Sequence, residues 1–259
     1  MMELTPAGLI TLLTLNVFQT FTSPAERYEA IDRELTTLNP DVATFQEVKL
    51  GKSGASSIDH LLPSHAHRIV KGRPGGYVQA IVSRHPILRT LEVPFRNNRA
   101  RMALGAVIAV PTPGGTREVL VLTTHLDYQL THHSERRAQL KAIVAAAESF
   151  DGPVAVTGDL NFGDGEAESD AIPDTFTDVW RALNGAAPGY TWDREKNPMA
   201  KKGSLVGEPS RRLDRIFWRG GRALESRIVF NQRVRPADTT RPALFPSDHY
   251  GVFAKLEVR

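Results

Sequence analysis

Acidic, amide and imidazole side chains recur in this sequence at the ends of short apolar runs. Asp159 and Asn161 follow "VAV" within "VTGDLNFGDGE", and Glu47 follows an apolar run in "VATFQEV". His125 lies near the end of "LVLTTHL", and His249 directly precedes "YGVFAKLEV". A carboxylate beside a buried strand is costly unless a charged group meets it. The placement therefore predicts that charged partners lie beside these carboxylates.

Three further polar residues occupy similar positions. Asn16 follows the first apolar run in "LTLNVF", Asp214 lies in "RRLDRIFW", and Asp248 lies in "SDHYGV". Oxygen ligands from Glu, Asp and Asn suit a hard cation such as Mg²⁺. Histidines can donate to anionic oxygens, and a carboxylate beside a histidine fixes its tautomer and stabilises its protonated form. The whole set fits metal-assisted attack of water on a phosphodiester.

Each of these residues also has a structural explanation. Asp159 and Asn161 could form an Asx turn after a strand, and Asp214 could pair with a neighbouring arginine. Glu47 could end a strand in water, and His249 could be a core histidine with its hydrogen bonds satisfied. The joint occurrence of all these motifs favours the catalytic interpretation.

Three other residues could bind a ligand but also have simpler roles. His132 and His133 in "THHSERR" are followed by no third ligand with zinc spacing, so we expect a solvated start of a helix there, with a substrate contact as the alternative. Trp192 in "GYTWDREKNP" either packs in a core or loop, or offers a stacking platform for a base of single-stranded nucleic acid.

Short apolar runs separated by turn residues predict the elements that position these groups. The enrichment in β-branched and apolar residues favours strands at residues 9–18, 41–48, 77–84, 103–110, 118–126, 152–160, 212–218 and 250–258. The turn residues of 110–119 predict a hairpin with antiparallel pairing. Residues 23–40, which begin with Ser-Pro, and residues 134–150, which are rich in helix formers, predict two helices.

Length and composition indicate an ordinary globular chain. It has 259 residues, of which 41% are hydrophobic and 24% charged, and no cysteine. A disulfide or a thiolate metal site is therefore excluded, and a reducing compartment is permitted. No repeat or linker divides the sequence, so we expect one α+β domain over residues 1–259, with flexible loops at 51–60 and 193–212.

The apolar run near the start of the sequence reads as a first strand. It is preceded by no Lys or Arg and followed by no clear cleavage site, unlike a signal peptide. No window approaches the roughly 18 apolar residues of a membrane span. We expect a soluble, cytoplasmic monomer.

Basic residues are concentrated in two segments although the formal net charge is only +3. The clusters comprise Arg84, Arg89, Arg96, Arg99 and Arg101, and then Lys201, Lys202, Arg211, Arg212, Arg215, Arg219 and Arg222. Such clusters either keep a protein soluble or contact the phosphates of an anionic substrate. Arg101 and Arg212, together with Trp192, are our candidate substrate contacts.

The motifs "LNVF", "FQEV", "TTHL", "TGDLNF", "LDRIF" and "SDHYGV", in this order, resemble the endonuclease/exonuclease/phosphatase superfamily of DNase I-like proteins. The resemblance extends from Leu15 to Val252, and "YVQAIVSRHPI" adds to it. It implies a four-layer αββα sandwich, in which two mixed β-sheets pack face to face with helices outside. The motifs are then expected to converge at one edge of the sandwich.

The resemblance also implies a role for each residue. Glu47 and Asn16 resemble the Mg²⁺ ligands, with Asp248 as a second acid on the metal side, and Mn²⁺ can substitute. Asp159 resembles the group that orients or deprotonates the attacking water, with Asn161 as its partner. His125 and His249 resemble donors to the phosphoryl oxygens, and Asp214 resembles the carboxylate that aligns His249.

The expected activity is Mg²⁺-dependent hydrolysis of phosphodiester bonds in nucleic acid. "PDTFTDVW", "GYTWD" and "RRLDRIFW" resemble 5′-tyrosyl-DNA phosphodiesterases, as do "VPFRNNRARMALGAVIAV" and "THLDYQLTHHSERRAQLKAI". DNA is therefore the favoured substrate, and phosphotyrosyl DNA ends are one candidate form of it. The alternatives are a phosphatase or phospholipase-type hydrolase of a small or lipid phosphoester, and a non-catalytic binding module on the same fold.

Overall fold

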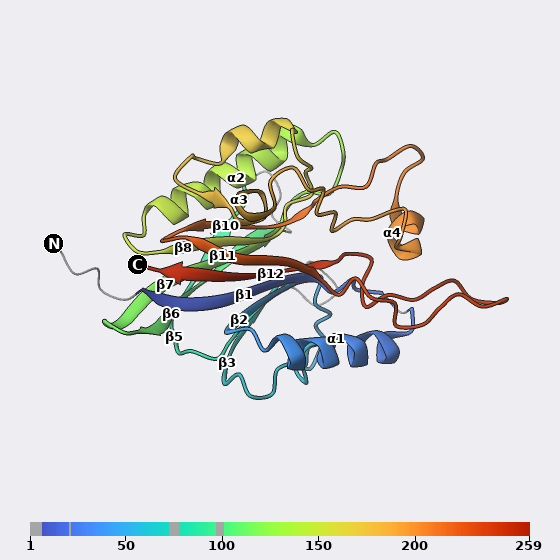
Figure 1. Ribbon diagram of the computed structural model, residues 1–259, viewed down its shortest axis with the longest axis horizontal. Helices are drawn as coiled ribbons and strands as arrows, with labels where there is room; N and C mark the ends of the chain where they lie inside the picture. Colours follow the sequence, from blue (N-terminus) through green and yellow to red (C-terminus); the bar gives the residue numbers. More distant parts are fainter. Residues whose placement is uncertain (1–6, 21, 73–77, 97–100) are drawn as a thin grey trace.

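Two six-stranded sheets form the centre of the molecule (Figure 1). The computed structural model describes residues 7–20, 22–72, 78–96 and 101–259. The first sheet has the strand order β11-β12-β1-β2-β4-β3, and the second has the order β5-β6-β7-β8-β10-β9. Arg99 of the first basic cluster lies outside the described residues.

The strands of the first sheet come from both ends of the sequence. They are β1 (Gly8–Asn16), β2 (Val42–Gln46), β3 (His67–Lys71), β4 (Gln79–Ser83), β11 (Ala223–Val229) and β12 (Gly251–Val258). β1 and β2 pair in parallel, and β12 pairs antiparallel with β1. The sheet is therefore mixed, as expected.

The second sheet uses the middle of the sequence. It consists of β5 (Ile87–Pro94), β6 (Met102–Thr112), β7 (Gly115–His125), β8 (Val154–Asp159), β9 (Thr177–Asp178) and β10 (Asp214–Arg219). β6 and β7 form the predicted hairpin, in which Thr112 pairs with Gly115. β7 and β8 are parallel, whereas β10 is antiparallel to β8.

Helices cover the outer faces of both sheets. α1 (Pro24–Leu38) packs on the first sheet, and α2 (His133–Glu148) packs on the second (Figure 1). The short helix α3 (Val179–Asn184) instead places Val179 in the layer between the sheets. A 3-10 helix, η1 (Ala167–Ala171), and α4 (Pro198–Gly203) lie in the connections. The predicted four-layer αββα sandwich is confirmed.

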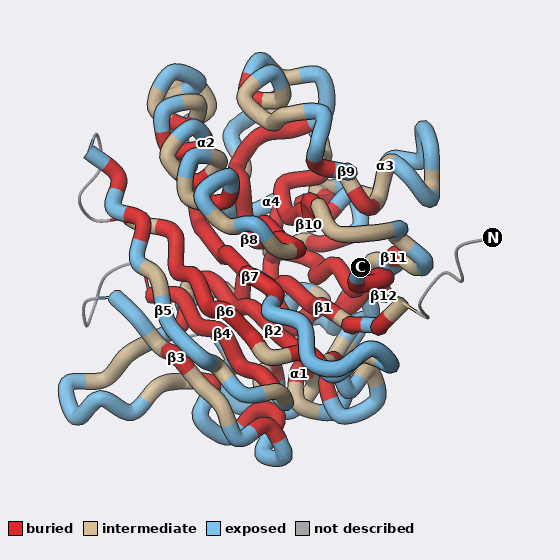
Figure 2. The backbone as a smooth tube through the Cα atoms, turned by 90° about the vertical axis from the view of Figure 1, so that its left-hand side faces the viewer, coloured by how far each residue is buried: buried red, intermediate tan, exposed pale blue. Residues whose placement is uncertain are grey.

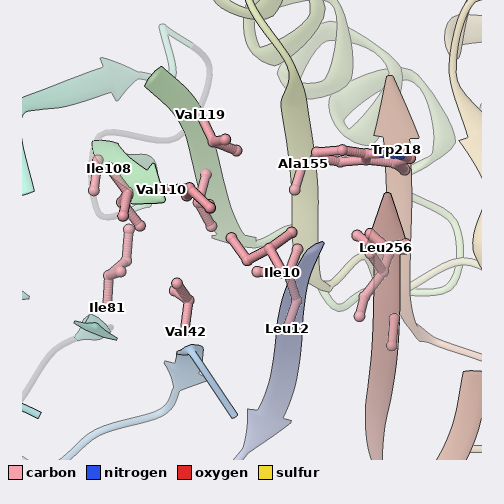
Figure 3. Packing of buried hydrophobic residues seen from close by; sticks show 14 of the residues in the cluster. Ile10, Leu12, Val42, Ile81, Ile108, Val110, Val119, Ala155, Trp218 and Leu256 are labelled. Atoms are coloured by element: carbon pink, nitrogen blue, oxygen red, sulfur yellow. The ribbon is translucent and has the colours of Figure 1, made fainter. Parts of the chain in front are cut away.

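The period-two alternation of the strands explains this packing. In β1, Ile10 and Leu12 point into the layer between the sheets, whereas Leu13 and Leu15 point toward α1. Figure 3 shows Ile10 and Leu12 in the same layer as Val119 and Trp218 of the other sheet. Both faces of the inner strands are consequently buried (Figure 2).

The eight predicted strands and the two predicted helices are all present. Helix α1 begins at Pro24, as the Ser-Pro signal predicted, but the side chain of Ser23 makes no capping hydrogen bond. The expected loop at 193–212 was partly wrong, because it contains α4. Among the described residues, no helix is long and apolar enough to cross a membrane.

The strands that the sequence did not predict are the four edge strands of the two sheets, namely β3, β5, β9 and β11. β5 has the burial pattern of a largely exposed strand and carries Arg89 and Glu92. Charged residues on edge strands prevent pairing with other chains. The same charges weaken the hydrophobic signal, so edge strands are harder to predict than central ones.

Candidate active site

The strand directions bring the six motifs to one edge of the sandwich. The parallel pairs place Asn16 beside Gln46 and His125 beside Asp159. The antiparallel strand β10 begins at this same edge, where Asp214 pairs with Asp159. β12 also begins here, so that the residues just before Gly251 reach the edge as well. The site therefore lies where β1, β2, β7 and β8 end and where the antiparallel strands β10 and β12 begin.

Direct contacts join the two sheets at this edge. The Nδ2 of Asn16 donates to Glu47 Oε1 at 3.1 Å and to Asp159 Oδ2 at 3.0 Å. Asn161 donates its backbone N–H to Asp159 Oδ1 at 3.1 Å and its Nδ2 to the carbonyl of Leu126 at 3.0 Å. The carboxylate of Asp159 is almost fully buried and is therefore oriented from both sheets.

Two histidines converge on the same carboxylate. The Nε2 of His125 lies 3.4 Å from Asp159 Oδ2, and the Nε2 of His249 lies 3.7 Å from that oxygen. On its other side, His249 Nδ1 is 2.7 Å from Asp214 Oδ2. The sequence placed Asp214 beside His249, and the structure brings the two together in a buried pair.

The surroundings give the two histidines different charges. Burial, and secondarily the charge of Arg101, lowers the pKa of His125 to about 4. Burial also opposes the charged form of His249, but the carboxylates of Asp214 and Asp159 raise its pKa well above the ordinary value. At neutral pH the site thus holds one neutral and one cationic imidazole.

Asp159 is ionised for a related reason. Burial raises the pKa of its carboxyl group, but the charge of His249, joined at acidic pH by that of protonated His125, outweighs this effect and lowers the pKa. The hydrogen bonds from Asn16 and from the Asn161 backbone act in the same direction. Asp159 is therefore a carboxylate that can accept hydrogen bonds in the cavity.

Asp248 and Glu47 form an acidic pair. Burial, together with the negative charge of Glu47, raises the pKa of Asp248 to about 7 against the opposing charges of His249 and Arg27. Repulsion between two carboxylates in a buried place is relieved by a cation. With the amide of Asn16 beside them, these side chains offer the oxygen donors that a hard divalent cation prefers, so the residues present fit such an ion.

A second group of possible ligands overlaps with the site. Atoms of Asp159, Asp214 and His249 lie within 4.8 Å of one another. In this group, however, the short contact between His249 and Asp214 is satisfied by a proton on Nδ1. A cation bound by all three of these residues would have to displace that proton.

Arg27 joins the segment that follows Asn16 to the segment that carries Asp248. Its fully buried guanidinium donates to the carbonyls of Val17 and Phe18, just after β1, and to that of Pro246. Asp248 follows Pro246 by two residues. The sequence gave no indication of this role, because an arginine in an amphipathic helix normally faces solvent.

Ser247 and Thr191 position the site through hydroxyl groups. Ser247 Oγ donates to the carbonyl of Asn16 at 2.6 Å, and Thr191 Oγ1 accepts from the backbone N–H groups of Leu213 and Asp214. Both hydroxyl-bearing residues are fully buried. Ser247 lies in the motif "SDHYGV" and Thr191 in "GYTWD". Membership of these motifs was the only indication in the sequence that the two residues belong to the site.

The layer between the sheets becomes polar close to the site. Gln46 Nε2 donates to Thr123 Oγ1 at 2.9 Å, and the hydroxyls of Thr44 and Thr157 lie 3.0 Å apart. These contacts connect strands of different sheets and involve fully buried side chains. Such hydrogen bonds fix the register of one sheet against the other more strictly than apolar contacts do.

The backbone is strained where the catalytic candidates leave their strands. Glu47 and Asn161 both have a φ of 55°, which is unusual for residues other than glycine. Gly158 has a φ of 125°, and a Cβ there would lie 2.1 Å from the carbonyl oxygen of Thr124. The glycine of "TGDLNF" is therefore required by the close approach of β7.

A cavity of about 550 Å³ opens beside these groups. Its lining includes six of the eight predicted catalytic and metal-binding residues, namely Glu47, His125, Asp159, Asn161, Asp248 and His249. Asn16 and Asp214 lie behind the lining and contact it through Glu47, Asp159 and His249. A ligand in the cavity could thus reach both the acidic pair and the histidines.

Two of the three predicted substrate contacts line the cavity. Trp192 lies with its ring centroid 4.8 Å from that of His249. Arg101 donates to the carbonyls of His125 and Leu126. Both side chains are largely buried.

The prediction for Arg212 needs correction. Its guanidinium is buried and bonds Asp164 and Asp178 instead of lining the cavity. Arg211, one residue earlier, lines the cavity in its place. Successive side chains in an extended segment point to opposite sides, so an offset of one residue exchanges the two environments.

The described residues of the two basic clusters have different surroundings. Among their described members, Arg101 and Arg211 line the cavity. Others are paired elsewhere: Arg89 with Glu118, Arg215 beside Asp164, and Arg222 with Glu257. These arginines therefore already have acidic partners within the chain.

His132 and His133 lie at the start of α2, as expected, but neither is simply solvated. His132 Nδ1 lies 2.9 Å from Asp127 Oδ1, and His133 Nδ1 lies 2.9 Å from Glu168 Oε1. Glu166 joins His133 and Glu168 in a group whose atoms lie within 4.8 Å. The guanidinium of Arg136 donates to Glu168 at 2.7 Å, so the positive charge of this arginine already occupies the position beside Glu168 that a metal ion would need.

Comparisons with known proteins agree with this geometry. Residues 13–249 match the model of the Endonuclease/Exonuclease/phosphatase family. Tyrosyl-DNA phosphodiesterase 2 of Bos taurus is 29% identical over 90% of this chain and 63% of its own length. The chain thus spans less than two thirds of that relative.

Solved structures show the same fold. Truncated Caenorhabditis elegans TDP2 has a TM-score of 0.77 at 23% identity, covering 96% of this chain and 98% of that one. D. rerio TDP2, complexed with a single-strand DNA product, has a TM-score of 0.77 at 22% identity, covering 95% and 98%.

Proposed function

Because the chain belongs to the endonuclease/exonuclease/phosphatase family, we propose that it hydrolyses phosphodiester bonds with the aid of a divalent cation. The observation that carries this proposal is the convergence on Asp159. Its carboxylate is hydrogen-bonded by Asn16 and lies within 3.7 Å of both histidines, in a cavity that also exposes Glu47 and Asp248.

Glu47 and Asp248, with Asn16 beside them, would hold the cation, which we propose to be Mg²⁺, with Mn²⁺ as a substitute. The chemistry that the bound ion supplies is neutralisation of the negative charge on the phosphate and leaving-group oxygens. Glu47 has a positive φ directly after β2 and lines the cavity. The strained backbone conformation of Glu47 thus lies at the point where the proposed oxygen ligands of the cation meet.

Asp159 would orient the attacking water and accept its proton as the new P–O bond forms. The hydrogen bonds from Asn16 and from the Asn161 backbone hold this carboxylate in one orientation. A fixed acceptor raises the fraction of bound waters that are aligned for attack. The bond to the leaving oxygen breaks on the opposite side of the phosphorus.

The two histidines would stabilise the phosphoryl oxygens. His249 is held cationic by Asp214 and can donate a charge-assisted hydrogen bond from Nε2. His125 is neutral and can donate one hydrogen bond. Donors aimed at developing charge each typically contribute a factor of about 10² to 10³ in rate.

We propose DNA as the substrate, with 5′-phosphotyrosyl ends as the specific target. The support is the name of the bovine relative and the single-strand DNA product in the D. rerio structure. Arg101, Arg211 and Trp192 around the cavity are suited to a phosphate and a base. Oligomeric state does not enter this proposal.

A panel of substrates tests the proposal. With Mg²⁺, we expect turnover of a 5′-phosphotyrosyl oligonucleotide to exceed that of unmodified single-stranded and duplex DNA, abasic DNA, RNA and inositol phosphates. The Asp159→Asn variant serves as the inactive control. Faster turnover of an inositol or lipid phosphoester would favour the phosphatase alternative, and no turnover of any substrate would favour a binding module.

A further inference from the structure

The segment between β7 and α2 forms one wall of the cavity. Four of its consecutive residues, Tyr128 to Thr131, line the cavity, although none belongs to a strand or helix. A wall made of irregular chain can position a substrate only if it is held in place by other groups.

Arg136 of α2 holds this segment from behind. Its fully buried guanidinium donates to the carbonyls of Asp127 at 3.1 Å, Gln129 at 2.5 Å and Leu130 at 3.3 Å. A guanidinium has five donors spread over a planar fork and can bind these three carbonyls and a carboxylate together, whereas a lysine has three donors on a single nitrogen. The backbone of residues 127–130 is therefore curled around one side chain.

Arg136 is itself fixed by a buried acid. Its Nε donates to Glu168 Oε1 at 2.7 Å, and both side chains are fully buried. Gln139, one turn further along α2, accepts from the backbone N–H of Asp127 at 3.0 Å. The Asp127 carboxylate also contacts His132 at 2.9 Å, which closes the segment at its other end.

This rigid segment presents one large side chain to solvent. Tyr128 is 58% exposed at the cavity, although the large apolar ring of a tyrosine is normally buried. The guanidinium of Arg101 lies 5.7 Å from the centre of the Tyr128 ring. An exposed ring beside a cation and next to the catalytic carboxylate is suited to stacking on another aromatic ring.

We propose that Tyr128 is an aromatic platform that stacks on a ring attached to the scissile phosphate, and that Arg136 is the positioning residue that holds this platform. The inference rests on the proposed phosphodiesterase activity. The ring belongs either to a nucleobase or to a phenolic leaving group, and both have the flat apolar face that the platform requires.

Two synthetic esters distinguish the sources of the ring. One is thymidine 5′-(p-nitrophenyl phosphate), and the other is the same ester of deoxyribose without a base. If the base stacks, Tyr128→Ala lowers kcat/KM for the first ester by about tenfold more than for the second. If the phenolic group stacks, both values fall by a similar factor of about ten.

The conservative variant supplies the control. Tyr128→Phe keeps the ring and is expected to retain kcat/KM within about twofold for both esters. The proposal is overturned if Tyr128→Ala leaves both values unchanged, or if Tyr128→Phe loses as much as Tyr128→Ala. Because the side chain is exposed, neither substitution is expected to disturb folding.

Arg136→Lys tests the positioning role. It keeps a positive charge beside Glu168 but loses the fork, so we expect KM for the favoured ester to rise about fivefold while kcat changes less than twofold. Arg219→Lys is the matched control, because Arg219 donates to the carbonyls of Ala147 and Phe150 near the other end of α2. It should lower the Tm without changing KM.

Equal changes of KM in the two arginine variants, or no change in Arg136→Lys, would overturn the positioning role. If Arg136→Lys does not fold, the double variant Arg136→Met/Glu168→Met replaces it, since it leaves no unpaired buried charge. Failure of the wild-type protein to cleave either ester with Mg²⁺ would instead contradict the proposed function.

Discussion

Replacing Asp214 by asparagine removes a charge from the site without changing its shape. Asp214 is fully buried and reaches the cavity through His249, whose Nδ1 lies 2.7 Å from Asp214 Oδ2. The amide oxygen of Asn can still accept the hydrogen bond, but it no longer stabilises the imidazolium. We therefore expect His249 to lose its positive charge in Asp214→Asn and to donate a weaker hydrogen bond to the phosphate.

The size of the effect follows from the burial of the pair. The side chains of His249 and Asp214 are 6% and 0% exposed, so solvent screens their interaction little. A hydrogen bond to a charged group contributes a net of about 1.5–3 kcal/mol. If this contribution is lost in the transition state, kcat falls by about 10- to 150-fold.

Steady-state hydrolysis of thymidine 5′-(p-nitrophenyl phosphate) at saturating Mg²⁺ measures this change. Asp178→Asn is a matched control, because Asp178 is the partner of buried Arg212 and lies outside the cavity lining. Thermal unfolding of both variants separates loss of fold from loss of chemistry. A kcat for Asp214→Asn within threefold of the wild-type value, in a folded protein, would refute the role of the His249–Asp214 pair.

Three further predictions concern stability. Gly158→Ala should destabilise the protein by at least about 3 kcal/mol, because the new Cβ would lie 2.1 Å from the Thr124 carbonyl oxygen at a φ of 125°; a denaturant titration measures this, and a loss below 1 kcal/mol would contradict the reasoning. Thr157→Val should cost about 1–3 kcal/mol in the same titration, because it leaves hydrogen-bonding partners buried in the layer between the sheets, and an unchanged midpoint would argue against that layer. Burial raises the pKa of Asp164, but hydrogen bonds from Arg212 and Arg181 outweigh burial and lower this pKa. The ionised carboxylate of Asp164 therefore stabilises the fold above about pH 4, and this stabilisation is lost as the pH falls through the lowered pKa. Asp164→Asn should therefore show a smaller loss of stability than the wild type between about pH 5 and pH 3, and parallel curves would exclude this ion pair as the cause.

The central strands could be predicted because both of their faces are buried. β1 and β8 are almost entirely apolar until their last residues, Asn16 and Asp159, and this contrast marked both the strand and the site. The edge strands lacked such a signal, since β5 and β11 mix exposed residues, some of them charged, with partly buried ones in no regular order. Pairing with a neighbour, rather than their own pattern, decides that these segments are strands.

The residues of the candidate site could be predicted from the sequence, but the residues that hold them in place could not. Asp159, His125 and His249 carry chemistry in their own side chains, so their type and position were informative. Arg27 and Arg136 act through backbone carbonyls of distant segments, and nothing in the local sequence distinguishes such an arginine from a solvated one. The exchange between Arg211 and Arg212 likewise depends on the pairing of Trp192 with Arg211, which only the fold determines.

Some expectations stay predictions. They are the single domain over residues 1–259, the cytoplasmic localisation, the monomeric state and the roles assigned to the individual site residues.

The central claim is that Glu47 and Asp248 hold a divalent cation beside the carboxylate of Asp159. Titration of Mg²⁺ into the chelator-treated protein, with hydrolysis of a phosphodiester as the readout, tests this claim most directly. We predict no turnover without the metal, saturable recovery with Mg²⁺, and a midpoint at least about tenfold higher for Glu47→Gln. Undiminished turnover in the presence of chelator, or the same Mg²⁺ midpoint for Glu47→Gln as for the wild type, would contradict it.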